Sequence, residues 1–270
     1  MLFASLLIRF ILITRSVQAS INGAVILSMD MLNISNATLT FDDPLLSSRA
    51  SARHHHAKQL IEEISVCSFD KWYGVFTSPC PSSMHKHFSE RGLALAHYNV
   101  WLDFIYFDPI VSGNLTACSK IGDNEFENRD GQLYKNGKRF QDNDIIIILE
   151  DDADIFVTDI NKVLRDELQE MTTDVLYLGW CEGRNARPVP LCLHAYALTR
   201  GGARKLVHYY EPCGKAIDEQ FVIMAKNNWI SYRKVNPSSY KSNYRENYPI
   251  FNEKTFGIFH QKNLGSLNGH

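Results

Sequence analysis

Four carboxylates follow directly on the most apolar run of the chain. The stretch IIIILEDDADIF, residues 145–156, brings five aliphatic side chains up to Glu150, Asp151, Asp152 and Asp154. Like charges at this spacing repel one another, and this costs free energy unless water or a cation lies beside them. If the backbone stays extended, Glu150, Asp152 and Asp154 project to one side and Asp151 to the other. Two or three carboxylate oxygens can then converge.

Oxygen ligands of this kind suit a hard cation such as Mg²⁺ or Mn²⁺. Proteins typically hold these ions by one or two carboxylates, while the phosphates of a substrate complete the coordination shell. This arrangement suits a nucleotide diphosphate, whose charge a metal neutralises as a Lewis acid during bond cleavage. The alternative is a solvated acidic turn that stabilises the positive N-terminus of the following helix. The segment alone leaves both interpretations open.

The elements around this segment determine where its carboxylates lie. The run DIIIIL is typical of a central parallel strand that is covered on both faces. Hydrophobic periodicity and turn residues predict the remaining elements. Strands are predicted at residues 23–30, 71–76, 174–180, 194–199 and 229–235, and helices at 47–64, 84–106, 160–171, 200–210 and 216–227. Thr199 can cap the helix that follows it, and the two glycines after Arg200 allow close approach to the sheet.

Alternating strands and helices predict the α/β class, with a Rossmann-type, largely parallel central sheet flanked by helices. Ligands of such sheets collect at the carboxyl ends of the strands, where residues 150–154 lie. The polar stretch 112–143 has no strong periodicity, so we expect it to be either disordered or functional.

The length of 270 residues suits one large α/β domain. We divide the chain into a signal peptide at 1–19, one domain at 20–237 and a C-terminal tail at 238–270. The net charge is −2, so no electrostatic argument favours a nucleic-acid partner, and we expect none. The oligomeric state cannot be read from the sequence.

The N-terminus indicates the secretory pathway. An apolar stretch ends in Val17-Gln18-Ala19, which has the small-residue spacing of a signal-peptidase site, and we expect cleavage after Ala19. An uncleaved anchor is the alternative. Glycan acceptor sequons at Asn33, Asn36 and Asn114 agree with this route. We therefore expect the protein in the lumen of the ER or Golgi, or secreted.

The six cysteines form an even set without a CxxC pair, which fits disulfides in an oxidising compartment rather than a zinc ribbon. The most economical pair is Cys181 with Cys192, which would close the loop EGRNARPVPL. Free buried thiols are the alternative.

Three separated blocks resemble glycosyltransferase family 25, which contains bacterial lipooligosaccharide galactosyltransferases and animal procollagen galactosyltransferases. SERGLALAHYNVW is similar to the family block Gly-Glu-x-Gly-Cys-x-x-Ser-His, with His97 in register and Ala96 where serine is usual. IILEDDADIF is similar to the block Leu-Glu-Asp-Asp-Ala. HAYALTRGGARKL, followed by AIDEQF, resembles the closing block. The order and spacing agree over residues 22–235.

The resemblance implies a GT-A-like nucleotide-sugar fold and a divalent metal, Mn²⁺ or Mg²⁺. It also implies inverting transfer of galactose or glucose from a UDP-sugar to a hydroxyl of a protein or glycan acceptor. Glu150 and Asp152 look like the DxD-type pair of the family, which holds metal and donor, with Asp154 as an auxiliary ligand. Residues 20–237 would then be the glycosyltransferase domain.

Inverting transfer needs a base near the acceptor hydroxyl. Asp218 resembles the late acidic residue of the family and is our candidate, with Glu219 and Asp151 as rivals.

Further candidates concern the donor. Family members usually carry an arginine-rich stretch directly after the first strand. In this chain residues 28–44 intervene before Arg49 and Arg53, which could contact the nucleotide from a longer loop. The family match gives His97 a donor-site role, whereas its apolar helix favours a structural histidine. Arg184 could clamp phosphate bidentately, or it could lie on a solvent-facing basic loop.

Other histidines are candidate metal ligands by residue type. In His54-His55-His56 consecutive helical side chains point about 100° apart and cannot converge on one ion, so we predict a solvated helix face. His260 could reach back as a third metal ligand.

Two other classes of function remain open at this stage. One is a secreted, non-catalytic GT-A-like protein that binds glycans or partners, which the altered loop after the first strand favours. The other is a metal-dependent hydrolase that uses the same carboxylates. The presence of Glu150, Asp152 and Asp218 favours the transferase.

Overall fold

The computed structural model describes most of the predicted domain and part of the predicted tail. The described residues are 21–27, 52–53, 55–57, 59–60, 63–64, 88–106, 126–129, 132–135, 141–181, 191–211, 214–236, 240 and 255–261. The predicted signal peptide, the strand at 71–76 and the three sequons lie outside these residues. No helix in the described ranges is long and apolar enough to cross a membrane.

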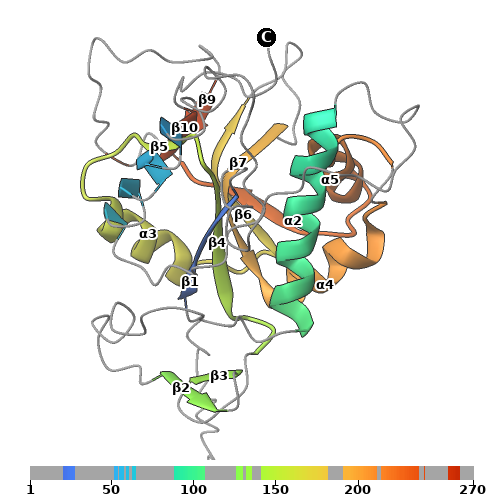
Figure 1. Cartoon of the computed structure of the whole chain (residues 1–270), viewed down its shortest axis with the longest axis horizontal. Helices are drawn as coiled ribbons and strands as arrows, with labels where there is room; N and C mark the ends of the chain where they lie inside the picture. The colour runs from blue at the N-terminus through green and yellow to red at the C-terminus, as the bar shows by residue number, and fades with distance from the viewer. Residues whose placement is uncertain are drawn as a thin grey trace, which may run out of the picture.

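A six-stranded sheet forms the centre of the molecule (Figure 1). Its order is β1-β4-β7-β6-β8, and β9 also pairs with β6. The strands are β1 (Ile21–Leu27), β4 (Ile145–Glu150), β6 (Val175–Cys181), β7 (Leu191–Thr199), β8 (Tyr232–Lys234) and β9 (Thr255–Gly257). Two small sheets pair β2 (Phe126–Arg129) with β3 (Gln132–Lys135) and β5 (Ala153–Ile155) with β10 (Phe259–Gln261).

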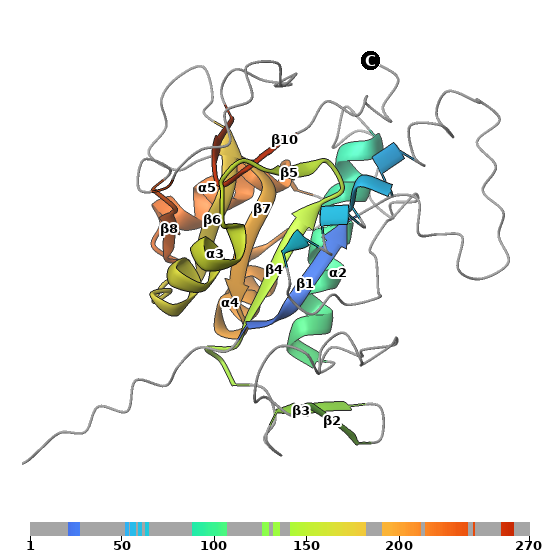
Figure 2. The same ribbon diagram turned by 90° about the vertical axis from the view of Figure 1, so that its left-hand side faces the viewer.

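Helices cover both faces of this sheet, so the α/β class is confirmed. They are α2 (Phe88–Tyr106), α3 (Ile160–Gln169), α4 (Arg200–Tyr209) and α5 (Ile217–Lys226). Helix α3 lies on one side of the sheet and α2, α4 and α5 on the other (Figures 1 and 2). The described residues between 52 and 63 are helical as well. Each of these helices and each central strand except β9 coincides with a predicted element.

The sheet is mixed, and the prediction of a largely parallel sheet is wrong. β1 is parallel to β4 and β8 to β6, but β7 is antiparallel to both β4 and β6, and β9 is antiparallel to β6. The apolar run of β4 correctly indicated burial on both faces, which says nothing about strand direction. The deciding feature is the segment 182–190. It is shorter than the crossover of about a dozen or more residues that a parallel neighbour needs.

The core is built on the aliphatic run that the sequence singled out. Every side chain of residues 145–149 is at most 2% exposed. On α2, the apolar residues at helical spacing are Leu93, Ala96, Val100 and Phe104, of which the last three are buried against the core and Leu93 is 36% exposed. Burial on this scale is the main stabilising contribution, at about 25 cal/mol per Å² of apolar surface.

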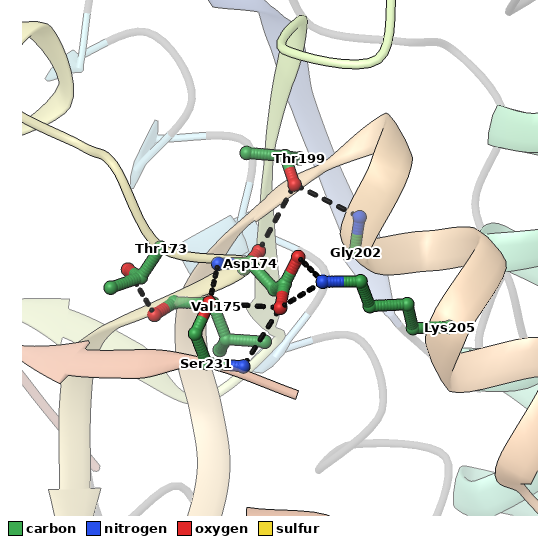
Figure 3. A network of polar contacts seen from close by, with 7 residues as sticks. All are labelled: Thr173, Asp174, Val175, Thr199, Gly202, Lys205 and Ser231. Carbon is green, nitrogen blue, oxygen red and sulfur yellow. Dashed lines mark hydrogen bonds and ion pairs between the residues drawn. The ribbon is translucent and has the colours of Figure 1, made fainter. Parts of the chain in front are cut away.

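The start of α4 is fixed to the sheet by a polar network (Figure 3). Thr199 caps the helix as predicted, because its hydroxyl accepts a 2.9 Å hydrogen bond from the backbone N–H of Gly202. A Cβ at Gly202 would lie 2.7 Å from the carbonyl oxygen of Asp174, so the close approach requires glycine. The carboxylate of Asp174 accepts two 2.8 Å bonds from Lys205 and further bonds from Ser231. This network joins α4 to the beginnings of β6 and β8.

Two strands come from the segment assigned to the tail. β9 pairs with the second half of β6, while β8 pairs with the first half of the same edge. β10 continues from β9 and pairs with β5. Ile258, between the two strands, and Phe259, the first residue of β10, are fully buried. This C-terminal segment is therefore part of the folded domain and reaches the end of β4.

Candidate active site

The acidic segment forms a turn at the carboxyl end of β4. β4 ends at Glu150, the chain turns at Asp151 and Asp152, and β5 begins at Ala153. The expectation that an extended backbone sends Asp151 to the opposite side from Asp152 is therefore wrong. A turn breaks the alternation of side chains along a strand. Both aspartates instead face one guanidinium group.

That guanidinium belongs to Arg53. Its Nε donates a 2.8 Å hydrogen bond to Asp151 Oδ1, and its Nη2 donates a 3.1 Å bond to Asp152 Oδ2. The three side chains are 5–15% exposed. Burial lowers the pKa of Arg53, but Asp152 and Asp151 outweigh it, so the pKa rises above its usual value and the group stays charged. Arg53 is the positive charge that the acidic junction requires.

The remaining negative charge is only partly compensated. Burial raises the pKa of Asp152 to about 7, although the charge of Arg53 acts in the opposite direction. Burial likewise raises the pKa of Glu150 to about 7, and the carboxylates of Asp151 and Asp218 contribute. A further cation would therefore be electrostatically favoured here.

Two carboxylate oxygens of the turn are buried without a hydrogen-bond partner: Asp152 Oδ1 and Asp154 Oδ2. Buried polar atoms normally have partners, so these two oxygens are available to coordinate a cation or to accept a hydrogen bond from a ligand. In the described part of the chain, however, no three His, Cys, Asp or Glu side chains form a group that could hold a metal alone. Ligands from a substrate would have to complete the shell.

The histidine run lies beside this turn. His55 is exposed as predicted. The prediction of a solvated face is wrong for His56, which is 7% exposed, because its Nε2 forms a 2.8 Å hydrogen bond with the carbonyl oxygen of Ala153. The same nitrogen lies 3.7 Å from Asp154 Oδ1. Buried polar groups normally have a hydrogen-bond partner, but the run carried no signal for this contact.

Glu150 is surrounded by groups from three other elements. The side-chain amide of Gln261 on β10 forms a hydrogen bond with it and lowers its pKa. His97 Nε2 on α2 lies 3.7 Å from Glu150 Oε1. Asp218, in the first turn of α5, is close enough for its charge to raise the pKa of Glu150. The structure thus gathers Glu150, His97 and Asp218, which the sequence placed in one site.

The two acidic residues at the start of α5 differ in environment. Asp218 is partly buried, and burial raises its pKa, while the backbone N–H groups of Glu219 and Cys192 act in the opposite direction. Glu219 is exposed. Asp151, the other rival for the role of base, is held by Arg53. Of the three, Asp218 is the carboxylate that is both near Glu150 and free of an ion pair among the described residues.

The predicted disulfide between Cys181 and Cys192 is confirmed, with Cα atoms 5.4 Å apart. It connects the end of β6 to the start of β7 at the edge where the acidic turn lies. Cys181 Sγ is 3.9 Å from Gln261 Oε1, and the backbone N–H of Cys192 bonds to Asp218. The disulfide therefore lies beside two neighbours of Glu150, Gln261 and Asp218.

The other candidates have different positions. Arg49 and Arg184 lie outside the described residues and stay predictions. His260 pairs directly opposite Asp154 between β10 and β5, and its ring stacks on Phe156 with centroids 3.7 Å apart.

Sequence reasoning missed Gln261 and Tyr196 as members of the site. Gln261 lies in a stretch without periodicity, and Tyr196 is one aromatic residue in an apolar strand, so neither carried a recognisable signal.

The chain matches no known protein-family model, and no curated protein is significantly similar to it.

Proposed function

We propose that the protein is a metal-dependent glycosyltransferase that transfers galactose or glucose from a UDP-sugar to a hydroxyl of a protein or glycan. The mixed α/β sheet with an acidic turn at the end of β4 supports a GT-A-like arrangement. The resemblance to family 25 of the blocks around His97, Glu150 and Asp218 supports the reaction, since His97 and Asp218 both lie near the carboxylate of Glu150.

The observation that carries the proposal is the pair of buried, unpartnered oxygens on Asp152 and Asp154. Two carboxylates from among Asp152, Asp154 and Glu150 would hold Mn²⁺ or Mg²⁺, because two carboxylates with diphosphate oxygens suffice for such an ion. Bound there, the ion would supply Lewis-acid neutralisation of the leaving diphosphate.

Asp218 is the proposed base. As the acceptor oxygen attacks the anomeric carbon and the bond to UDP breaks, Asp218 takes the proton of the acceptor hydroxyl. Its partly buried position, held by the N–H of Cys192, supports this role. Direct displacement inverts the anomeric configuration. Arg53 keeps Asp151 and Asp152 in place rather than reacting.

We also propose that the protein works in the secretory pathway. The disulfide between Cys181 and Cys192 supports this location, because such bonds persist in oxidising compartments.

A glycan-binding protein without catalysis is the second candidate, because Arg53 already pairs with two of the turn carboxylates and supplies one positive charge without a metal. The test is UDP release from UDP-galactose and from UDP-glucose, with and without Mn²⁺. The transferase releases UDP only with metal, and release increases with an acceptor. A hydrolase releases it equally without acceptor. Absence of both turnover and Mn²⁺-coupled UDP binding would leave the binding protein.

A further inference from the structure

A chain of buried polar groups leads from the core to Glu150. Trp101 Nε1 donates a 2.9 Å hydrogen bond to the hydroxyl oxygen of Tyr196, and His97 Nδ1 lies 2.9 Å from the same oxygen. The ring of His97 stacks on that of Tyr196, with centroids 5.6 Å apart. All three residues are fully buried, at 0% exposure. They come from α2 and β7, two well-packed elements.

These contacts determine which nitrogen of His97 carries the proton. An indole nitrogen can only donate, so the Tyr196 oxygen accepts a hydrogen bond from Trp101. The Tyr196 hydroxyl must therefore donate its own hydrogen bond to a different acceptor. Among the described residues, His97 Nδ1 is the acceptor within reach. Nδ1 therefore accepts, and in the neutral imidazole the proton lies on Nε2.

His97 Nε2 is aimed at the site. It is buried without a hydrogen-bond partner, and Glu150 Oε1 lies 3.7 Å away. This distance is longer than a hydrogen bond, but contacts of this kind in a site without ligand often tighten on binding. The amide of Gln261 is a second neutral donor to the same carboxylate.

We propose that Trp101 and Tyr196 fix His97 as the Nε2-protonated tautomer, and that His97 in turn positions Glu150. The tautomer follows from the contacts alone, whereas the positioning role rests on the proposed function. Mutation of a residue that orients a metal ligand typically lowers metal affinity or activity by about 10- to 100-fold, so the effect is measurable. His97, Tyr196 and Trp101 are positioning residues and do not react.

The first test is ¹⁵N NMR of the histidine rings in the full chain, with the His97 signals assigned from their loss in His97→Gln. The expected wild-type pattern is a protonated Nε2 and an unprotonated Nδ1. In Tyr196→Phe the two tautomers mix, because Nδ1 loses its donor. Tyr210→Phe is the matched control, since the Tyr210 hydroxyl is buried in the same aromatic cluster but has no hydrogen-bond partner. It should keep the wild-type pattern.

A wild-type proton on Nδ1, or equal spectra for Tyr196→Phe and wild type, would overturn the tautomer. The second test is calorimetric binding of UDP in the presence of Mn²⁺. Tyr196→Phe should bind about 10-fold more weakly, with Tyr210→Phe unchanged. Equal binding by Tyr196→Phe and wild type would remove the positioning role. If the wild type does not bind UDP at all, the proposed function and the positioning role fail, while the NMR result still decides the tautomer.

Discussion

Arg53 explains how an apolar strand can run directly into a cluster of carboxylates. Its guanidinium lies across the turn and bonds to both Asp151 and Asp152, so part of the repulsion is compensated within the chain. Asp152 and Asp154 still keep one free buried oxygen each. The turn is therefore organised before any ligand arrives, and the free oxygens are left for one.

Replacing Arg53 by methionine tests this compensation. Arg53→Met keeps an unbranched apolar side chain but removes the guanidinium, which leaves Asp151 and Asp152 buried without that positive partner. Breaking a buried ion pair from one side costs about 3–5 kcal/mol, and partial exposure places the expected loss in unfolding free energy at the lower end, about 3 kcal/mol. Urea denaturation measures it.

Arg204→Met is the control for that experiment. Arg204 pairs with Asp142 through a similar 3.1 Å contact, but the two side chains are 47% and 73% exposed. An exposed pair of this kind contributes less than about 1 kcal/mol. If both variants lose the same small amount, Arg53 does not compensate the turn.

The sequence predicted the members of the site better than their contacts. Glu150, Asp152 and Asp218 follow from residue type and block order, and the structure brings Glu150 and Asp218 together. The Arg53 pairs could not be predicted, because they join residues about a hundred positions apart and depend on a turn that interrupts the strand pattern. The link from His97 to Tyr196 is equally long-range.

Individual elements were predictable where local chemistry decides them. The aliphatic run correctly predicted β4. Thr199 correctly predicted the start of α4, because capping depends on residues that are neighbours in the sequence. Strand direction was not predictable from apolar content, since β7 resembles a parallel strand in composition. The predicted strands at 174–180 and 194–199 left residues 181–193 between them, long enough for a crossover, and the connection became short only because β7 begins at Leu191.

The ionic network at the start of α4 predicts a pH dependence of stability. Burial of Asp174 acts to raise its pKa, but the bonds from Lys205 and Ser231 outweigh it, so the folded-state pKa lies below the ordinary 3.8. A carboxyl group whose pKa is lower in the folded than in the unfolded state stabilises the fold at pH values above its unfolded-state pKa. This stabilisation is lost as the pH falls through its folded-state pKa. Asp174→Asn should therefore cost about 2 kcal/mol near neutral pH and progressively less below pH 3.8.

Chemical denaturation of Asp174→Asn and wild type across this pH range measures the difference. Asp166→Asn is the control, because Asp166 forms an exposed pair with Lys162 on one helix and should change stability by less than about 0.5 kcal/mol. A difference for Asp174→Asn that stayed constant down to pH values well below 3.8 would show that the Asp174 carboxylate is not what joins α4 to the sheet.

At the scale of the whole molecule, the C-terminal segment completes both the sheet and the site. β9 and β8 divide one edge of β6 between them, and β10 brings Gln261 to Glu150. Gly257 makes this possible: its φ is 108°, and an added Cβ would lie 2.3 Å from the carbonyl oxygen of Leu178. Composition could not reveal such docking, because a single buried pair, Ile258 and Phe259, carries it.

Truncation of Phe259 tests whether the segment belongs to the core. Phe259 is 0% exposed, so Phe259→Ala should lower the free energy of unfolding by about 3–5 kcal/mol. Tyr106→Ala, at a position that is 62% exposed, should change it by less than about 1 kcal/mol. A loss for Phe259→Ala as small as that of the control would mean that residues 255–261 do not contribute to the folded domain in solution.

The central claim is that the acidic turn binds a divalent ion together with a sugar nucleotide, and calorimetric titration of UDP with and without Mn²⁺ tests it most directly. The wild type should bind UDP only with Mn²⁺. Asp152→Asn should lose this coupling with an almost unchanged melting temperature, because asparagine keeps an oxygen for Arg53. Asp142→Asn, on the surface, should behave as wild type. Equal UDP affinity in Asp152→Asn and wild type would contradict the claim.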